Sequence, residues 1–183
     1  SAPPGATQTA PAAQVRRATL ALATGGFAIG TGEFVIMGLL PDVASDLSIT
    51  IPEAGHMISA YALGVVIGAP VLAVLGARLE RRAFLIALMV LFAIGNLATA
   101  LAPDYHSLGI LRLLTGLPHG TYFGVAALVV AALSPPDQRA RAVGLLMLGL
   151  TTATLVGVPI AAGLGQLLSW RAAFVFVAAI AVL

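Results

Sequence analysis

The segment ATLALATGGFAIGTGEFVIMGLL, residues 18–40, carries one ionisable side chain, Glu33, among apolar and small residues. About 20 such residues are enough for an α-helix to cross the hydrocarbon core of a bilayer, which is ~30 Å thick. We therefore predict that residues 18–40 form a membrane span. A carboxylate inside a span is rare and usually functional, so Glu33 is the first candidate site residue.

The composition of the whole chain is that of a membrane protein. Of its 183 residues, 60% are hydrophobic and 9% are charged, whereas soluble domains carry about 25% charged residues. The chain has no cysteine, which excludes disulfides and thiolate metal sites. A net charge of +2, carried by short arginine clusters, does not predict a nucleic-acid partner. No motif predicts a metal site, a catalytic site or a bound cofactor.

Five segments are long enough to span a membrane, and short connections join them: residues 18–40, 54–76, 83–102, 107–133 and 142–168. A sixth apolar segment, residues 172–183, stops before it could cross a bilayer. We interpret it as an incomplete span, and the chain as the N-terminal part of a longer protein. Residues 1–15 are rich in Ala and Pro and are predicted to be a disordered cytoplasmic tail.

The arginines indicate the orientation of these spans. Seven fall on the side of the N-terminus: Arg16, Arg17, Arg78, Arg81, Arg82, Arg139 and Arg141. On the other side only Arg171 is basic, among several acidic residues. Because cytoplasmic loops are enriched in Lys and Arg, we predict that the N-terminus is cytoplasmic.

Two charges are predicted to lie inside the bilayer, on Glu33 and Arg112. From the ends of their spans, Glu33 lies about 10 Å and Arg112 about 7–8 Å below the same membrane surface. We expect an ion pair between them, direct or through water, because a lone buried charge is costly. A carboxyl group that can gain or lose a proton beside an arginine is a candidate for proton coupling, although a purely structural pair is the alternative.

The fourth predicted span carries a polar stripe. Arg112, Thr115, His119 and Tyr122 follow a 3-4-3 spacing that places them on one helical face. Met37 shares a face with Glu33 in the first span in the same way. We expect Met37, Thr115, His119 and Tyr122 to line a substrate cavity. The alternative for His119, Tyr122 and Met37 is ordinary packing.

Three further pieces follow one another in a characteristic order. The connection AVLGARLERR, residues 73–82, contains Arg78, Arg81 and Arg82; Gly116 lies one turn after Arg112; and the fifth span contains GVPIAAG, residues 157–163. Together with GEFVIMGLLPDVASDLSITIPEAG and LPHGTYFGVAALV, they resemble the N-terminal half of a major facilitator superfamily transporter. Within that family the chain is most similar to drug:proton antiporters of the arabinose-efflux and chloramphenicol-resistance type.

The resemblance implies an all-α membrane protein of twelve spans, of which this chain supplies the N-terminal six-span domain, with the sixth span truncated. Each half is expected to contain two inverted three-helix repeats. The resemblance also assigns a gating role to the connection formed by Arg78, Glu80, Arg81 and Arg82, in which Ala77 and Glu80 replace the family's Asp and second Gly. An antiporter-like motif falls on Gly157, Pro159 and Gly163.

The function that the resemblance implies is therefore proton-coupled export of small amphipathic molecules, such as drugs, across a bacterial inner membrane. Its expected partners are the substrate, the lipid bilayer and the missing C-terminal half. Two alternatives remain at this point: a symporter or facilitator for uptake of sugars, nucleosides or other metabolites, and a membrane-embedded enzyme or assembly subunit.

Overall fold

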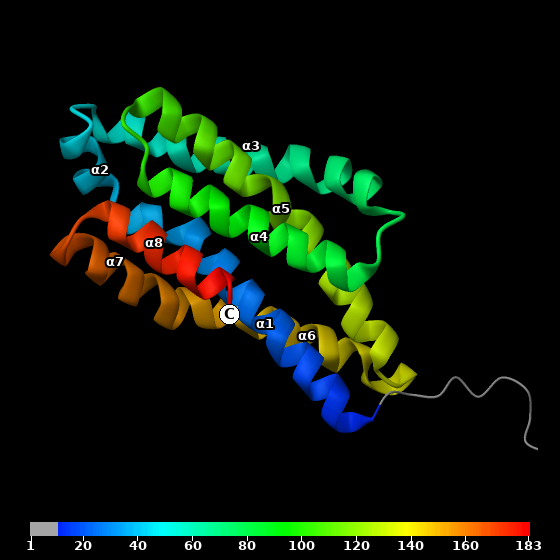
Figure 1. The fold of residues 1–183 in the computed structure, drawn as a ribbon. Coiled ribbons are helices and arrows are strands. Elements are labelled where there is room, and N and C mark those ends of the chain that lie inside the picture. The colour runs from blue at the N-terminus through cyan, green and yellow to red at the C-terminus, as the bar shows by residue number, and fades with distance from the viewer. Residues whose placement is uncertain (1–10) are drawn as a thin grey trace, which may run out of the picture.

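The computed structural model describes residues 11–183 as a bundle of helices, and this part of the chain contains no strand (Figure 1). The elements are α1 (Ala12–Phe34), the 3₁₀ turn η1 (Val35–Gly38), α2 (Leu40–Asp46), α3 (Ile51–Gly76), α4 (Arg81–Ala100), α5 (Tyr105–Leu133), the 3₁₀ turn η2 (Pro136–Gln138), α6 (Arg139–Thr152), the π-helical turn η3 (Ala153–Gly157), α7 (Val158–Leu167) and α8 (Trp170–Ala181).

The five predicted spans and the shorter sixth helix are confirmed. Five helical segments are long and apolar enough to cross a membrane: Ala13–Gly38, Ile51–Gly76, Arg81–Ala100, Tyr105–Leu133 and Pro136–Leu167. The sixth, α8, has 12 residues. Each helix begins a few residues earlier than the apolar pattern predicted, and α1 already begins at Ala12, inside the predicted tail. Residues 1–10 of that tail lie outside the described residues.

Polar side chains in the connections explain where several helices begin. Thr50 and Glu53 form a reciprocal capping box at the start of α3, as Asp104 and Ser107 do at the start of α5. The Glu80 carboxylate accepts hydrogen bonds from the first backbone N–H groups of α4. Such side chains satisfy backbone donors that have no partner within the helix. These bonds hold the pKa of Glu80 and Asp104 below the ordinary values.

The helices pack in a pattern that relates the two halves of the chain. Taking α1, α3 and α4 as the first repeat and α5, α6–α7 and α8 as the second, α1 packs on α6 and α3 packs on α5. The third helices of the two repeats, α4 and α8, pack on each other (Figure 1). The first helix of each repeat thus contacts the second helix of the other. This exchange is the arrangement expected of two inverted three-helix repeats.

The backbones of α3 and α5 approach each other closely at two glycines. A Cβ atom added at Gly64 would lie 2.0 Å from the carbonyl oxygen of Leu113, and one at Gly116 would lie 2.3 Å from that of Tyr61. Only glycine allows this spacing, as is common where transmembrane helices pack tightly. The Thr121 hydroxyl adds hydrogen bonds to the carbonyl oxygens of Gly68 and Ala69. The two helices therefore hold the residues between them in fixed register.

The fifth span is not a single regular helix. The π-helical turn η3 separates α6 from α7 and ends immediately before Val158 and Pro159. Proline has no N–H group and its ring crowds the preceding turn, which makes such a widening favourable. The fifth span is thus widened directly before Pro159. At Pro70 and Pro118, by contrast, α3 and α5 continue as α-helices.

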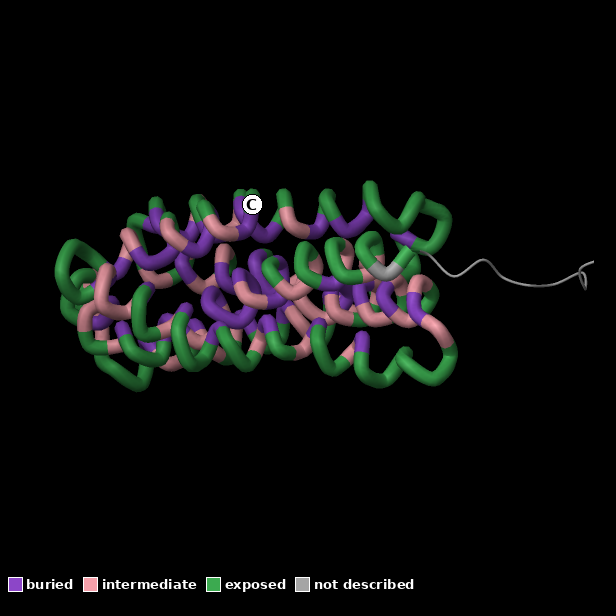
Figure 2. Tube along the Cα trace, turned by 90° about the horizontal axis from the view of Figure 1, so that it is seen from below, coloured by how far each residue is buried: buried purple, intermediate pink, exposed green. Residues whose placement is uncertain are grey.

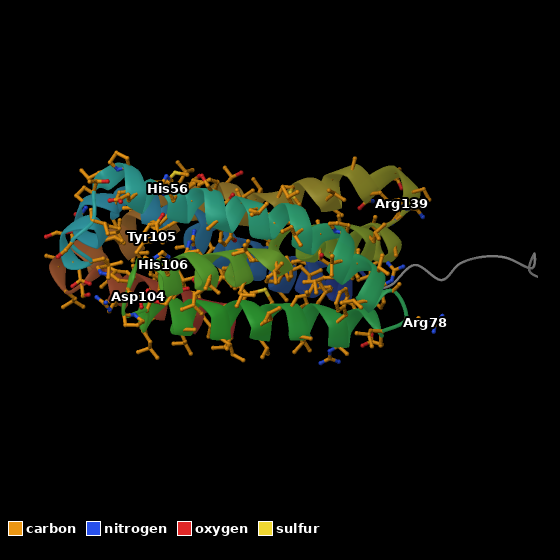
Figure 3. All side chains as sticks on the ribbon, turned by 90° about the horizontal axis from the view of Figure 1, so that it is seen from above. His56, Arg78, Asp104, Tyr105, His106 and Arg139 are labelled. Carbon is orange, nitrogen blue, oxygen red and sulfur yellow. The ribbon has the colours of Figure 1, made fainter. Side chains whose placement is uncertain are left out.

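The buried residues lie between the helices, and the outer surfaces of the bundle are exposed along its whole length (Figure 2). Many large apolar side chains are exposed, which suits a surface in contact with lipid. Figure 3 shows the two ends: Arg78 and Arg139 lie at one, and His56, Asp104, Tyr105 and His106 at the other. We call the first the arginine-rich end and the second the opposite end.

Candidate functional site

Arg112 is completely buried in the interior of the bundle, and its partners are not those predicted. One guanidinium nitrogen donates to the carbonyl oxygen of Gly32 at 3.0 Å, and the other terminal nitrogen donates to that of Glu33 at 3.4 Å. The guanidinium carbon lies 4.3 Å from the ring centre of Tyr61 and 5.5 Å from that of Phe174. Arg112 and the Glu33 carboxylate form no direct ion pair among the described residues, so the direct form of the predicted pair is wrong and the form through water stays a prediction. The guanidinium does contact the Glu33 backbone, as the prediction of a common depth requires.

The end of α1 explains why the arginine binds backbone. The last four carbonyl groups of an α-helix, here those of Thr31 to Phe34, have no partner in the regular pattern. The N–H of Val35 takes the first, and Arg112 takes the next two, at the point where α1 tightens into η1. A cation is also favourable at the negative end of the helix dipole. Arg112 thus fixes α5 to the end of α1 through the main chain.

The Glu33 carboxylate faces His119 instead. Its Oε2 atom lies 3.9 Å from Nδ1 of His119, and the two side chains are 27% and 13% exposed, respectively. The same Nδ1 atom is hydrogen-bonded to the Tyr61 hydroxyl at 3.1 Å. Glu33 from α1, Tyr61 from α3, and Arg112 and His119 from α5 therefore form one connected group, which we call the polar cluster.

Tyr61 was missed as a site residue by the sequence reasoning. It is the one ring in the cluster that contacts both Arg112 and His119. Its position could have indicated the contact, since Tyr61, Gly64 and Gly68 follow a 3-4 spacing on one face of α3. The two glycines on that face mark the surface that packs on α5.

The other predicted cavity residues lie away from the cluster. The Thr115 hydroxyl donates to the carbonyl of Leu111 in its own helix, and the side chain packs at Gly95 of α4. Tyr122 is buried, with its hydroxyl donating to the carbonyl of Leu22 in α1. Met37 is 47% exposed on η1. The polar stripe of α5 is thus turned mainly toward the bundle interior: Arg112 binds the Glu33 carbonyl, and His119 faces the Glu33 carboxylate.

Two large hollows, of 1160 Å³ and 860 Å³, flank α1 beside the last turn of α8. Ile180 and Leu183 line both, and Tyr122 lines the smaller one. Neither is lined by Glu33 or His119, so the polar cluster is a separate feature. Among residues 11–183, no group of His, Asp and Glu side chains is placed to hold a metal ion.

Comparison with known proteins shows the family of this chain. Residues 22–183 match the Major Facilitator Superfamily. The chain belongs to this superfamily. It is 46% identical to the inner membrane transport protein YdhP of Escherichia coli and 43% identical to the putative transporter AraJ of the same species, each time over 90% of this chain and 42% of the relative. It is 40% identical to a chloramphenicol resistance protein of Streptomyces lividans, over 84% of this chain and 39% of the relative.

The fold is shared with solved structures of the superfamily. The proton:xylose symporter XylE bound to 6-bromo-6-deoxy-D-glucose superposes with a TM-score of 0.83 at 18% identity, covering 92% of this chain and 43% of that one. The chain spans about two fifths of the length of these proteins. It therefore corresponds to the N-terminal six-span domain of the superfamily fold, and the relatives that it matches are named as transporters.

The superfamily's signature connection lies at the arginine-rich end. Arg78, Arg81 and Arg82 are exposed there, and none of them forms an ion pair within residues 11–183. Glu80, which stands where the family has glycine, caps α4 with its carboxylate. This connection therefore presents three arginines that have no acidic partner in the described part of the chain.

The antiporter-like motif lies where α7 approaches α1. Gly157 is buried, and a Cβ atom there would lie 2.1 Å from the Thr31 hydroxyl and 2.9 Å from the Phe27 ring. Pro159 is exposed in the first turn of α7, and a Cβ atom on Gly163 would meet nothing within 4 Å. Gly157 is thus the member of the motif that sets the contact with the first span.

A second polar group, which the sequence reasoning also missed, joins three connections at the opposite end. Asp46, at the end of α2, accepts hydrogen bonds from the Trp170 ring nitrogen at 3.0 Å and from the Arg171 guanidinium. Arg171 also donates to the carbonyl of Ala102 at 3.0 Å and stacks on Trp170. The hydrogen bonds from Arg171 and Trp170 hold the pKa of Asp46 below its ordinary value. We call Asp46, Trp170 and Arg171 the clasp.

Proposed function

We propose that the whole protein is a proton-coupled exporter of small amphipathic molecules, of which this chain forms the N-terminal domain. The observation that carries the proposal is the polar cluster, with a partly exposed carboxyl group, Glu33, set beside His119 in the apolar interior. Ionisable side chains at such depth mark proton or substrate paths in transporters. Similarity to a chloramphenicol resistance protein supports export as the direction.

In this proposal Glu33 carries the transported proton. When the carboxyl group is protonated it is neutral and tolerates an apolar environment, and when it is ionised it requires a donor or water. The two states therefore favour different arrangements of the surrounding helices. Arg112, which is bound to the carbonyls of Gly32 and Glu33, keeps the end of α1 in place in both states.

The substrate is proposed to approach the cluster from the side on which Glu33, His119 and Met37 are accessible. Met37 is exposed four residues after Glu33, and its flexible, polarisable side chain suits molecules that combine an apolar body with a polar group. Alternating access then requires the C-terminal half. By the positive-inside rule, the arginine-rich end is proposed to face the cytoplasm.

Transport by the purified full-length protein in proteoliposomes tests this function with two probes, chloramphenicol and xylose. A proton-coupled exporter moves chloramphenicol in the direction opposite to the proton flow that the imposed gradient drives. The compartment that the drug leaves therefore becomes more acidic. Movement of xylose together with protons, and no movement of chloramphenicol, would instead identify the uptake symporter that is the alternative.

The role of Glu33 is tested by Glu33→Gln, which keeps the shape of the side chain and removes its titration. We expect normal membrane insertion and loss of proton-driven transport. Glu53→Gln is the matched control, because Glu53 is an exposed capping residue in the first turn of α3 and glutamine also serves in a capping box. Proton-driven transport by Glu33→Gln at the rate of the unmodified protein would refute the assignment.

A further inference from the structure

Two oxygen atoms face a single nitrogen atom in the polar cluster. The Tyr61 hydroxyl lies 3.1 Å from Nδ1 of His119, within hydrogen-bond distance. The nearer oxygen of Glu33 lies 3.9 Å from the same nitrogen, beyond hydrogen-bond distance but within reach of a small side-chain rotation. The Tyr61 and His119 rings also meet edge to face, with their centres 5.9 Å apart.

An imidazole nitrogen either carries one proton and donates, or carries one lone pair and accepts. An ionised carboxylate can only accept hydrogen bonds, so Nδ1 can bond to it only when that nitrogen carries a proton. A tyrosine hydroxyl can donate or accept, so it satisfies Nδ1 in either form. Nδ1 has one site for two neighbours, and a short contact to one excludes a short contact to the other.

We propose that Tyr61 is a positioning residue that competes with the Glu33 carboxyl group for Nδ1 of His119. This inference rests on the proposed function for its role in transport. In the arrangement described, Tyr61 holds the imidazole and leaves Glu33 without a short contact to it. When Glu33 gains the contact, Tyr61 loses its partner.

Tyr61 is suited to this role because its own position is fixed. The side chain is buried, and the Arg112 guanidinium lies over its ring. The carbonyl of Tyr61 lies against Gly116, so the backbone of α3 cannot move independently of α5. The hydroxyl is therefore held at one place, and His119 is the part that turns.

The charged and titratable groups around His119 come from three helices. Glu33 faces it from α1 and Tyr61 faces it from α3, while Arg112 lies on its own helix α5 and contacts the Tyr61 ring. Arg112 is bound to two carbonyl oxygens and stays charged, so it supplies a constant field. From α8, the apolar ring of Phe174 lies against the Arg112 guanidinium. Glu33 is thus the group whose protonation state determines whether Nδ1 bonds to the carboxylate or to the Tyr61 hydroxyl.

The competition links α1 to α3. Ionisation of Glu33 draws His119 toward α1 and releases the Tyr61 hydroxyl, whereas protonation of Glu33 leaves His119 bound to α3. A single proton on Glu33 thereby decides which of two helices the imidazole joins, which is the kind of two-state contact that a rocking transporter can use.

Infrared titration of the purified full-length protein tests the proposal without relying on transport. The C=O stretching band of the protonated Glu33 carboxyl group is assigned by its absence in Glu33→Gln, and its midpoint is followed with pH. We expect Tyr61→Phe to move this midpoint to lower pH by about one unit, because the freed Nδ1 donates to the carboxylate and favours its charged form.

Tyr105→Phe is the matched control. Tyr105 makes the same kind of bond, from its hydroxyl to Nδ1 of His56 at 2.7 Å, but at the opposite end (Figure 3). It should leave the Glu33 midpoint unchanged. In a His119→Gln background, Tyr61→Phe should have no effect either. An unchanged or higher midpoint in Tyr61→Phe, an equal shift in Tyr105→Phe, or a shift that persists without His119 would each overturn the proposal.

If Tyr61→Phe does not yield folded protein, His119→Gln alone decides. In the proposal the ionised carboxylate gains the imidazole as a donor, so loss of the imidazole should move the Glu33 midpoint to higher pH. An unchanged or lower midpoint in His119→Gln would mean that the ionised carboxylate does not take His119 from Tyr61, and would overturn the proposal. Proton-driven transport that survives Glu33→Gln would refute the proposed function. The titration, by contrast, tests the contacts within the polar cluster and does not depend on transport.

Discussion

Arg112 contacts Glu33 through the main chain and not through the carboxylate: its guanidinium donates to the Glu33 carbonyl at 3.4 Å and to the neighbouring Gly32 carbonyl at 3.0 Å. The arginine therefore closes the end of α1, and the carboxyl group of Glu33 is left to interact with His119. Two ionisable residues at one depth in a membrane can thus have separate tasks. Arg112 holds the end of α1, and Glu33 is the group to which the proposed function assigns the change of protonation state.

The first prediction follows from this geometry. Arg112→Ala should destabilise the folded protein by about 1–2 kcal/mol, because two buried carbonyl groups lose their donor. Adding Glu33→Ala should not restore the loss, since no direct charge pair connects the two side chains. Reversible unfolding in mixed detergent micelles, applied to both single variants and the double variant, measures the coupling between them.

Arg112→Lys is the matched variant for that experiment. It keeps the charge but replaces a planar group that serves two carbonyls and stacks on Tyr61 by a single ammonium group. We expect it to recover part of the lost stability. Full recovery of Arg112→Ala on addition of Glu33→Ala would show instead that an uncompensated carboxylate was the cause.

The depth of the two charges was predictable because the ends of apolar segments set the level of each residue in a span. The atoms in contact were not predictable. They depend on the tightening of α1 into η1 at Val35, which no periodicity signals and which exposes the carbonyls that Arg112 binds. Tyr61 escaped notice because a lone tyrosine in an apolar span is usually a packing residue.

The fold could be predicted from the sequence more completely than the contacts between side chains. Hydrophobic length fixes the spans, and the pair Thr50 and Glu53 is a capping box legible in the sequence. The clasp was not foreseeable, because it joins Asp46 to Trp170 and Arg171 across more than a hundred residues. It also explains the one basic residue that lies among acidic residues: Arg171 is paired with Asp46.

The approach of α3 to α5 yields the second prediction. Gly64→Ala should destabilise the protein by about 1–3 kcal/mol, because the new methyl group overlaps the carbonyl oxygen of Leu113 and forces the helices apart. Gly124→Ala is the control, since a Cβ atom there meets nothing within 4 Å. Thermal unfolding of the two variants should separate them clearly. Equal melting temperatures would contradict the close packing described here.

The clasp carries the third prediction, which concerns acid. Because Arg171 and Trp170 hold the pKa of Asp46 below its ordinary value of 3.8, its contribution to stability is fully present above that value. It is lost as the pH falls below 3.8 and through the lowered pKa of the folded state. The emission of Trp170, the single tryptophan of these residues, should stay constant from neutral pH to about pH 5 and change only in stronger acid.

In Asp46→Asn the acid-induced change in Trp170 emission should disappear, since the amide does not titrate. Asp42→Asn, on the same short helix but outside the clasp, should retain it. Salt should weaken the contribution of Asp46, because the carboxylate is 44% exposed and the pair is screened. An emission change that begins well above pH 5 and persists in Asp46→Asn would assign the transition to another group.

The fourth prediction concerns the π-helical turn in the fifth span. Pro159→Ala supplies an N–H group that can donate to the carbonyl of Leu155, and it removes the ring that crowds that turn. The turn Ala153–Gly157 should then contract to a regular α-helix, and amide hydrogen exchange over this stretch should slow. Pro136→Ala is the control, because a proline in the first turn replaces an N–H that has no helical partner. Unchanged exchange across Ala153–Gly157 in Pro159→Ala would show that the packing of Gly157 against Phe27 and Thr31, and not the proline, maintains the widened turn.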